Sequence, residues 1–211
     1  MTVFSYNDLS YELIDSSYIS IVGGNPTGTL IIPPTIIHNN IQPYPVQEIS
    51  ANAFSNNLYI TSIDASNSNL RIIKSSAFQD CHGIKSVNLT NSQLLNTISV
   101  WCFYNSYHIT SIDLSGCTSL SIIDNYAFRA CFGITSIDFT NCFELTTLGD
   151  LVFQTTYNNP SQIIEYDFTY CTKLSTFGSN VFENNQSLKT IRFGSIEPPT
   201  FNISLGSNIG I

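Results

Sequence analysis

The sequence predicts a solenoid built from stacked copies of one short unit, and three observations support that prediction. A phenylalanine recurs at steps of 24, 25, 25, 25 and 29 residues. After each one comes a six-residue stretch with apolar residues at its first, fourth and sixth places. A further apolar residue closes most units. One unit of this size cannot bury its own apolar face, so each copy has to pack on its neighbours.

These columns are filled in nearly every copy. The phenylalanines are Phe54, Phe78, Phe103, Phe128, Phe153 and Phe182. The three apolar places are Ile60/Ile63/Ala65, Ile84/Val87/Leu89, Ile109/Ile112/Leu114, Ile134/Ile137/Phe139, Ile163/Tyr166/Phe168 and Leu188/Ile191/Phe193, and the closing residues are Leu70, Leu95, Leu120, Leu145 and Leu174. The period and the pattern L-x-x-L-x-L-x-x-N/C are typical of leucine-rich repeats. We therefore predict an α/β leucine-rich-repeat solenoid, with a curved parallel β-sheet on its concave face and short helical turns and loops on its convex face.

Residues 1–48 do not follow the period and are predicted to form a mostly β N-terminal cap. Residues 11–14 and 18–22 are rich in aromatic and β-branched residues and are predicted to be strands, followed by a turn at 23–28. The segment 29–34 (TLIIPP) would supply the last apolar pair of an imperfect zeroth repeat, Leu30 and Ile32, before two prolines end the strand. Such a cap would cover a core face and a strand edge that are otherwise exposed.

Residues 49–196 are predicted to form six repeats, which start at residues 49, 73, 98, 123, 148 and 177. In each repeat the T-S-I-D-type stretch should be a parallel strand, and all six strands should join one sheet. The A-F element, as at Ala77-Phe78, should form a short helical turn on the opposite wall. An insertion at 156–160 (TYNNP) in the fifth repeat is expected to be a tolerated surface loop, although such insertions often mark a binding face. Residues 197–211 would be a C-terminal cap or the cut end of a longer protein.

The charge balance narrows the classes of partner. The net charge is −8, from 15 acidic and 7 basic residues, which argues against nucleic acid because that binding depends on Lys and Arg at the phosphates. An acidic field favours cations or basic partners instead. No apolar run reaches the 18 or more residues of a membrane span, and the start MTVFSYNDLS lacks the features of a secretory signal. The chain is therefore expected to be soluble, with any export depending on a signal outside it.

The six cysteines all occupy repeat positions, which favours a packing role. Cys117, Cys142 and Cys171 share the N/C place, Cys81 and Cys131 come three residues after the phenylalanine, and Cys102 replaces the alanine before it. We predict small, buried, free thiols. Distance alone leaves a disulfide open between neighbours in the N/C column. A zinc site is disfavoured because there is no C-x-x-C and no histidine at ligand spacing.

One polar column stands out on the predicted sheet, between the two inner apolar residues of each strand. Its members are Asp64, Asn88, Asp113, Asp138, Asp167 and Arg192. Stacking would place neighbouring aspartates about 5 Å apart, with a repulsion of roughly 0.8 kcal/mol per pair even at the dielectric constant of water. The column is either a binding site for cations or a basic partner segment, or a set of solvated consensus residues whose hydroxyl neighbours soften the repulsion. The residues that flank the column as hydrogen-bonding neighbours are Ser62, Ser86, Ser111, Ser136 and Glu165.

No residue pattern indicates catalysis, a metal or a cofactor. The three histidines, His38, His82 and His108, lie in different predicted loops, and no serine, histidine and acid recur together. Acid–base catalysis would need two carboxyl groups converging in a cleft, and the repeat pattern indicates no pocket for them. A calcium site needs six to eight oxygen ligands, more than one flat column supplies. The sequence therefore predicts a protein that is not an enzyme.

The units follow I-x-x-x-A-F-x-x-C-x-x-I-x-S-I-D-F-T, best seen at residues 123–140, and resemble the BspA-like leucine-rich-repeat family from Thr29 to about Pro199. The resemblance implies a cell-surface or extracellular protein that recognises other proteins in adhesion or host interaction, for example a host extracellular-matrix or surface protein. It brings no catalytic residue. Two alternatives stay open: an intracellular scaffold of the same fold, which free cysteines and the missing signal favour, and a structural segment of a longer surface protein. The oligomeric state is not indicated.

Overall fold

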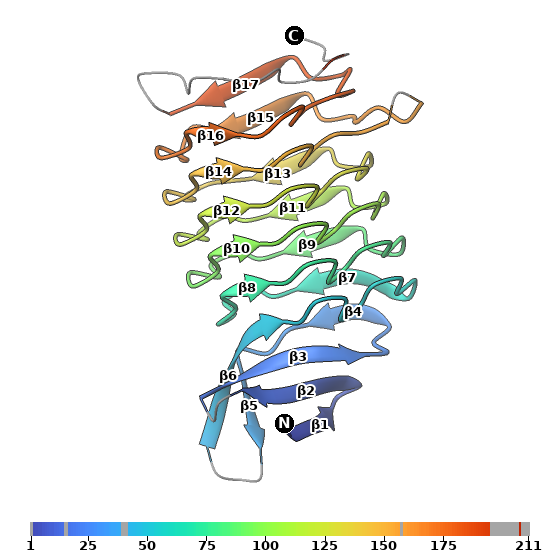
Figure 1. The fold of residues 1–211 in the computed structure, drawn as a ribbon, viewed down its shortest axis with the longest axis vertical. Coiled ribbons are helices and arrows are strands. Elements are labelled where there is room, and N and C mark those ends of the chain that lie inside the picture. The colour runs from blue at the N-terminus through green and yellow to red at the C-terminus, as the bar shows by residue number, and fades with distance from the viewer. Residues whose placement is uncertain (1, 15–16, 39–41, 157, 195–206, 208–211) are drawn as a thin grey trace.

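The computed structural model describes residues 2–14, 17–38, 42–156, 158–194 and 207. Within these ranges the chain forms a stack of turns along one long axis, with the N-terminus at one end (Figure 1). Successive turns contribute short strands to one continuous parallel ladder, and to a second parallel ladder that is followed by a separate pair of strands. The predicted C-terminal cap at 197–211 lies outside the described residues except for Ser207, and so does Tyr157 of the insertion.

The N-terminal segment is built from antiparallel strands. Strand β1 (Thr2–Tyr6) pairs with β2 (Leu9–Ile14), β2 pairs with β3 (Tyr18–Gly24), and β5 (Thr35–His38) pairs with β6 (Gln42–Ile49). The prediction of strands within β2 and β3 is confirmed, whereas β1, β5 and β6 were not predicted. Strand β3 pairs in parallel with β6, which joins this segment to the first ladder of the solenoid.

The first ladder consists of very short strands at the start of each repeat. After β6 come β8 (Ile72–Ile73), β10 (Thr97–Ile98), β12 (Ile122–Ile123), β14 (Thr147–Leu148) and β16 (Thr176–Phe177), all parallel. This ladder was not predicted from the sequence. Its only signal is the recurring pair of β-branched or other apolar residues, which suit a pleated and half-buried surface.

The second ladder contains the T-S-I-D-type strands. Its members are β4 (Gly28–Ile31), β7 (Ile60–Asp64), β9 (Ser86–Asn88), β11 (Ser111–Asp113) and β13 (Ser136–Asp138), and β15 (Glu165–Phe168) pairs separately with β17 (Thr190–Phe193). These parallel strands confirm the predicted strand positions. The prediction of one sheet of all six strands is wrong, because the hydrogen-bonded ladder ends at β13. The break coincides with the longer fifth repeat, whose extra residues precede β15.

The predicted helical turns at the A-F elements are also wrong, since the described residues contain no helix. The residue two places before the phenylalanine has positive φ in all six repeats, and the residue two places after it does so in five, for example 57° at both Ser76 and Asp80. A left-handed residue every four positions cannot continue an α-helix. The Phe78 N–H instead donates to the Cys102 carbonyl of the next turn, at 2.8 Å. Backbone groups that a helix would pair internally are thus paired between turns.

Two kinds of residue occupy the left-handed position two places before the phenylalanine. The six repeats hold Asn52, Ser76, Trp101, Tyr126, Leu151 and Asn180 there, all with φ between 55° and 60°. Asparagine adopts this conformation comparatively easily. The contact between Cβ and the following carbonyl costs roughly 1–2 kcal/mol, and a bulky residue lacks the local hydrogen bonds with which asparagine offsets it. The middle three repeats therefore depart from the residue type that suits their own backbone.

The core is organised around the repeated phenylalanines, which form one continuous ladder of stacked rings. Centroids of neighbouring rings from Phe54 to Phe182 are 5.2 to 6.0 Å apart, with interplanar angles of 5° to 16°. All six rings are buried. Aromatic pairs at such separations contribute about 0.5–1.5 kcal/mol beyond the burial of their area. The ladder therefore ties each turn to the next.

The cysteines donate hydrogen bonds between turns. The thiols of Cys81 and Cys131 each lie 3.0 Å from the carbonyl oxygen of the phenylalanine one repeat earlier. Ser106 occupies the same place and donates to the Phe78 carbonyl at 2.8 Å. In the N/C column, Cys117 donates to the Leu89 carbonyl at 3.1 Å. Both places are filled by side chains that donate to a carbonyl of the preceding turn, which cysteine and serine both do.

All six cysteines are free and buried, in agreement with the predicted packing role. Burial raises the pKa of the Cys81, Cys117, Cys131 and Cys171 thiols from 9.0 to about 12. For Cys102 burial also raises the pKa well above its usual value. These thiols stay protonated and unreactive at neutral pH, because the thiolate is the nucleophilic form.

Truncating one ring of the ladder should destabilise the protein strongly. Phe103→Ala leaves a cavity between two stacked rings and should lower the free energy of unfolding by about 3–5 kcal/mol. Urea denaturation followed by circular dichroism measures this change. Phe132→Ala, at a partly exposed corner residue, is the control and should cost clearly less. Equal losses would contradict a structural role for the ladder.

Stability should also fall in strong alkali. The fold raises the Cys131 pKa from 9.0 to about 12, so it favours the protonated thiol. That contribution is fully present below pH 9 and is lost as the pH rises toward and through 12. Cys131→Ser keeps a donor, as Ser106 does, and should lose less stability over the same range. Urea titrations of both proteins across that range measure the difference, and identical pH profiles would refute the assignment.

Candidate functional site

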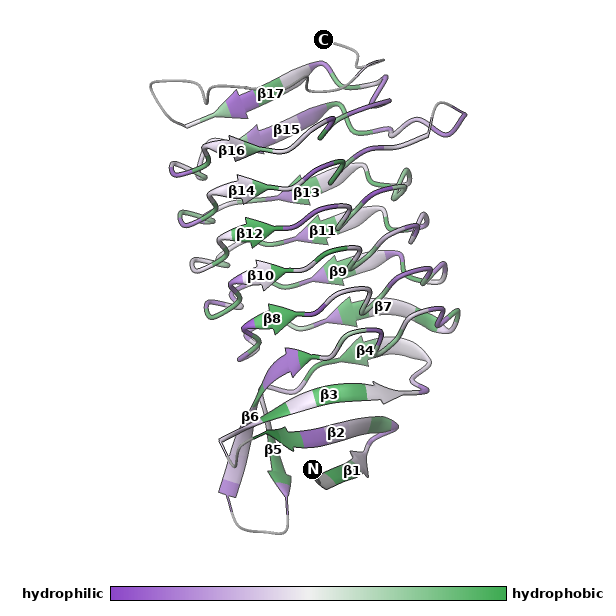
Figure 2. Ribbon diagram, in the orientation of Figure 1, coloured by the Kyte–Doolittle hydropathy of each residue, from purple (hydrophilic) through white to green (hydrophobic). Residues whose placement is uncertain are grey.

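The second ladder presents two straight columns of polar side chains, here called the aspartate face. The register pairs Ser62 with Ser86, and the column continues through Ser111 to Ser136. Beside it, Asp64 pairs with Asn88, and this column continues through Asp113 to Asp138. In Figure 2 the strands of this ladder change from hydrophobic to hydrophilic at their ends, where the second column lies. The stacking of these residues therefore extends over four repeats.

Each residue of the aspartate column also closes a turn. Its Oδ1 atom accepts the backbone N–H of the residue two places later, at 2.9 Å for Asp113 and 2.8 Å for Asp138. The hydroxyl of Ser115 donates to the same Asp113 oxygen at 2.6 Å. The full set of acceptors is Asp64, Asn88, Asp113, Asp138 and Asp167. Asp and Asn recur here because their side chains complete this turn, which leaves the second aspartate oxygen outside it.

At the end of the column the charge changes. Arg192 pairs in register with Asp167, and its Nε lies 2.7 Å from Oε1 of Glu165. That hydrogen bond raises the pKa of the Arg192 guanidinium. Glu165, expected to flank the column as a hydrogen-bonding neighbour, is thus occupied by an ion pair. The pair is exposed to solvent, so it adds little stability.

A hollow of about 420 Å³ opens on the aspartate face where the ladder breaks between β13 and β15. It brings Asp113, Asp138 and Asp167 together beside the exposed ring of Tyr170. The sequence pattern indicated no pocket. The one signal that could have located it is the longer fifth repeat, which interrupts the ladder. The hollow is lined by Ser111, Ile112, Asp113, Ser136, Ile137, Asp138, Phe139, Thr140, Asp167 and Tyr170.

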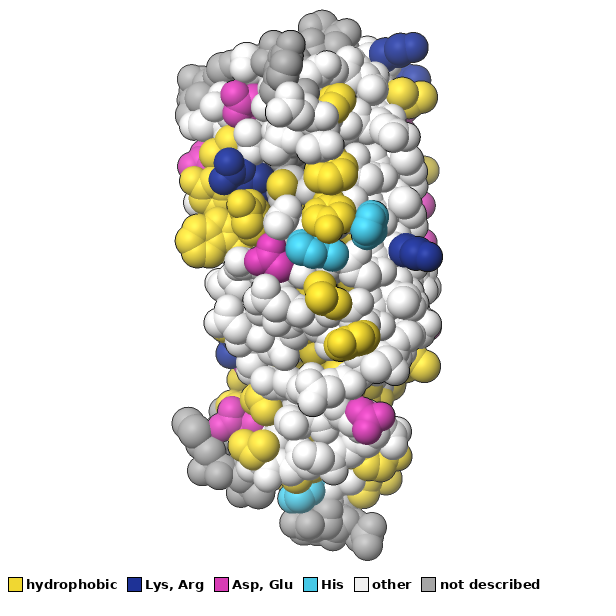
Figure 3. Space-filling view, turned by 90° about the vertical axis from the view of Figure 1, so that its right-hand side faces the viewer, with side chains coloured by type: hydrophobic (Ala, Val, Ile, Leu, Met, Phe, Trp, Pro, Cys, Tyr) yellow, Lys and Arg dark blue, Asp and Glu magenta, His cyan; other side chains and the backbone are white. Residues whose placement is uncertain are grey.

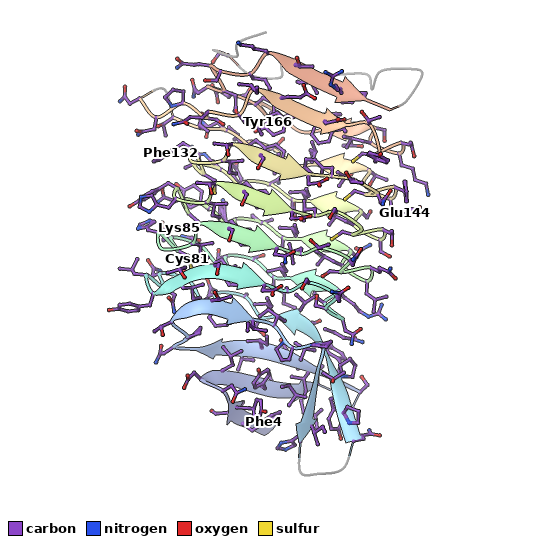
Figure 4. The ribbon with its side chains drawn as sticks, turned by 180° about the vertical axis from the view of Figure 1, so that it is seen from behind. Phe4, Cys81, Lys85, Phe132, Glu144 and Tyr166 are labelled. Atoms are coloured by element: carbon purple, nitrogen blue, oxygen red, sulfur yellow. The ribbon has the colours of Figure 1, made fainter. Side chains whose placement is uncertain are left out.

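The histidines lie away from this hollow. His82 stacks on Tyr107 with ring centroids 4.3 Å apart, and Nδ1 of His108 donates to the His82 carbonyl oxygen at 2.6 Å. His38 stacks on Phe4 in the N-terminal segment. Figure 4, seen from behind, shows Phe132 and Lys85 at the edge of the solenoid opposite Glu144. Across the described ranges, no group of three or more His, Cys, Asp or Glu residues is arranged to hold a metal ion.

Comparison with known proteins identifies the repeat class. The family model of the BspA type leucine rich repeat region matches residues 47–189 in six copies. The chain belongs to this BspA-type family. Membership makes protein recognition on a repeat scaffold the general expectation, because such solenoids present extended surfaces to protein partners. It points to no enzymatic class.

Solved structures show the same fold at low identity. A leucine-rich repeat protein from T. pallidum is 20% identical, with coverage of 89% of this chain and 91% of its own and a TM-score of 0.63. One from Bacteroides capillosus is 20% identical, covering 65% and 97%, with a TM-score of 0.57. The pneumococcal vaccine antigen PcpA is 18% identical, covering 91% of this chain but 48% of its own, with a TM-score of 0.67. No curated protein matches the sequence. A search of the described residues for a membrane-spanning helix finds none.

The two roles of the aspartate column can be separated by substitution. Asp138→Ala removes the turn acceptor and should lower the free energy of unfolding by about 1 kcal/mol. Asp138→Asn keeps an acceptor, as Asn88 does naturally, and should leave stability nearly unchanged. Urea denaturation of the two variants beside the wild type measures the effect. A loss as large for Asn as for Ala would mean that the charge, rather than the turn, determines stability.

Proposed function

We propose that the protein is a non-enzymatic recognition module at the cell surface, which binds a basic segment of a partner protein on its aspartate face. The observation that supports this most is the hollow at the break in the ladder. Three aspartates line it, each with one carboxylate oxygen outside its own turn. A Lys or Arg side chain fits this site, because it supplies donors and charge where the column has acceptors and mutual repulsion.

Two further features favour a basic segment. The ring of Tyr170 borders the hollow and offers a face for a cationic side chain. The serine column runs beside the aspartates for four repeats, so an extended segment has hydrogen-bonding groups along its length. The net charge of −8 attracts such a segment from a distance. A host extracellular-matrix or surface protein with an exposed basic stretch meets these requirements.

The surface location rests on the family and on the likeness to a pneumococcal vaccine antigen. An intracellular scaffold and a segment of a longer surface protein are the competing assignments. The free cysteines do not favour either, because all six are buried as hydrogen-bond donors or small core residues. Labelling of intact source cells with a membrane-impermeant biotin reagent separates a surface location from the intracellular scaffold. Failure to label the protein in intact cells, with labelling after lysis, would support the intracellular scaffold.

The binding face is tested by removing charge without removing the turns. A variant with Asp113→Asn, Asp138→Asn and Asp167→Asn should keep its stability but bind a fluorescein-labelled Arg/Ser peptide about tenfold more weakly, since close charge pairs are lost. Fluorescence polarisation measures the affinity.

The control variant changes three aspartates elsewhere, Asp8, Asp80 and Asp124, to asparagine and so has the same net charge. It should bind the peptide nearly as well as the wild type. An equal loss of affinity in both variants would mean that overall charge determines binding, and it would contradict a site on the aspartate face. Unchanged binding in both would exclude the proposal for this face.

A further inference from the structure

The wall that carries the A-F elements has an unusual surface in its middle repeats. The left-handed place before the phenylalanine holds Trp101, Tyr126 and Leu151 in three successive repeats, with φ of 56°, 60° and 55°. Repeats on either side hold asparagine or serine at this place. Bulky residues rarely adopt this conformation, so the three of them are the outliers of the column.

Burial in the core does not explain why bulky residues occupy this place. The side chain of Trp101 is 46% exposed, and Tyr126 and Leu151 are half-buried on the same wall. The rings of Trp101 and Tyr126 lie 5.9 Å apart, in a tilted arrangement. The left-handed backbone belongs to every repeat, so the feature that needs a separate explanation is the bulky side chain placed on it. A residue that suits its backbone poorly and adds little to the core is often kept for function.

A basic side chain is held in the same cluster. The guanidinium carbon of Arg129 lies 5.6 Å from the Tyr126 ring centroid and 5.8 Å from that of Tyr104. Its Nε donates to Oε1 of Gln154 at 2.5 Å. None of the ion pairs found among the described residues involves Arg129. The charge is therefore fixed in position between two rings, with its terminal nitrogens available to a carboxylate.

Figure 3 shows a group of hydrophobic side chains with a basic one over it at the left edge of that view, at the level of the middle repeats. We define the Trp101 patch as Trp101, Tyr104, Tyr126, Arg129 and Leu151. It lies on the A-F wall, whereas the aspartate face is built by the second ladder. The two surfaces are therefore separate and differ in chemistry.

We propose that the Trp101 patch is a second protein-docking surface, which receives an apolar side chain of a partner protein together with a neighbouring carboxylate. Trp, Tyr and Arg are the residue types that dominate binding energy at protein interfaces. Arg129 supplies the charge complementarity, because a guanidinium binds a carboxylate through paired donors. Its fixed position reduces the conformational entropy lost on binding.

The direct test uses defined peptides. Fluorescence polarisation compares a labelled acidic and apolar peptide, GSDLFESG, with its amide analogue GSNLFQSG and its basic analogue GSKLFKSG. The wild type should bind the acidic peptide about tenfold more tightly than either analogue, as expected for a desolvated charge pair beside an apolar anchor. Arg129→Gln should abolish this preference, whereas Arg71→Gln, at an exposed residue outside the patch, should retain it.

Trp101→Asn separates binding from folding. Asparagine suits the left-handed backbone, so the urea midpoint of this variant should equal or exceed that of the wild type, while the affinity for GSDLFESG falls about tenfold. Phe143→Asn, which removes another exposed aromatic ring outside the patch, should leave the affinity unchanged. A lower midpoint for Trp101→Asn with unchanged affinity would assign the tryptophan to folding and overturn the proposal.

Other occupants give different results. Preference for the basic peptide, or equal binding of all three peptides, overturns the assignment of an acidic partner. Concentration-dependent association in analytical ultracentrifugation that Trp101→Asn removes would make a second copy of the chain the occupant instead. Retention by a glycan array that depends on Trp101, without peptide binding, would make it a carbohydrate surface. The aspartate-face variant should bind GSDLFESG as the wild type does, so failure of one proposal leaves the other testable.

Discussion

Every turn of this protein depends on the next turn for partners to its backbone groups. The N–H of Phe78 donates to Cys102, and the same bond recurs from Phe54 to Ala77. A buried backbone group without a partner costs free energy, so the turns can stack only in register. The stacked phenylalanine rings and the two parallel ladders follow from that constraint, because residues at the same repeat position are brought into contact. A substitution therefore acts on at least two turns at once.

The same constraint explains why residues with reactive side chains serve structural purposes here. The thiol of Cys131 and the hydroxyl of Ser106 satisfy equivalent carbonyl groups, and Asn185 does the same from its own repeat. Asp113 and Asn88 close equivalent turns through the same side-chain oxygen. A polar residue that recurs in a repeat protein can therefore be explained by its structural role within the repeat. The groups left to bind a partner are the second carboxylate oxygen of each aspartate and the residues that differ between repeats.

Differences between repeats are concentrated in the middle of the chain. The hollow beside Tyr170 exists because the fifth repeat is longer and its strand β15 does not join β13. The Trp101 patch exists because three repeats replace asparagine or serine with bulky residues on a left-handed backbone. Both features reduce the regularity of the stack, and neither improves the core. They are the two surfaces at which we propose that a partner is recognised.

The sequence by itself determined the repeat class, the strand positions of the second ladder and the buried columns, since each follows from a pattern that local spacing reveals. The repeat position of every cysteine was likewise predicted from the alignment of the repeats. Only the tertiary structure decided that the A-F element is not helical, because this depends on the sign of φ at residues such as Ser76 and on amides bonded to the next turn. It also decided where the second ladder ends, that one oxygen of Asp138 is engaged in a turn, and that Arg129 lies between two rings. Contacts between turns carry all of this information, and spacing within one turn does not encode them.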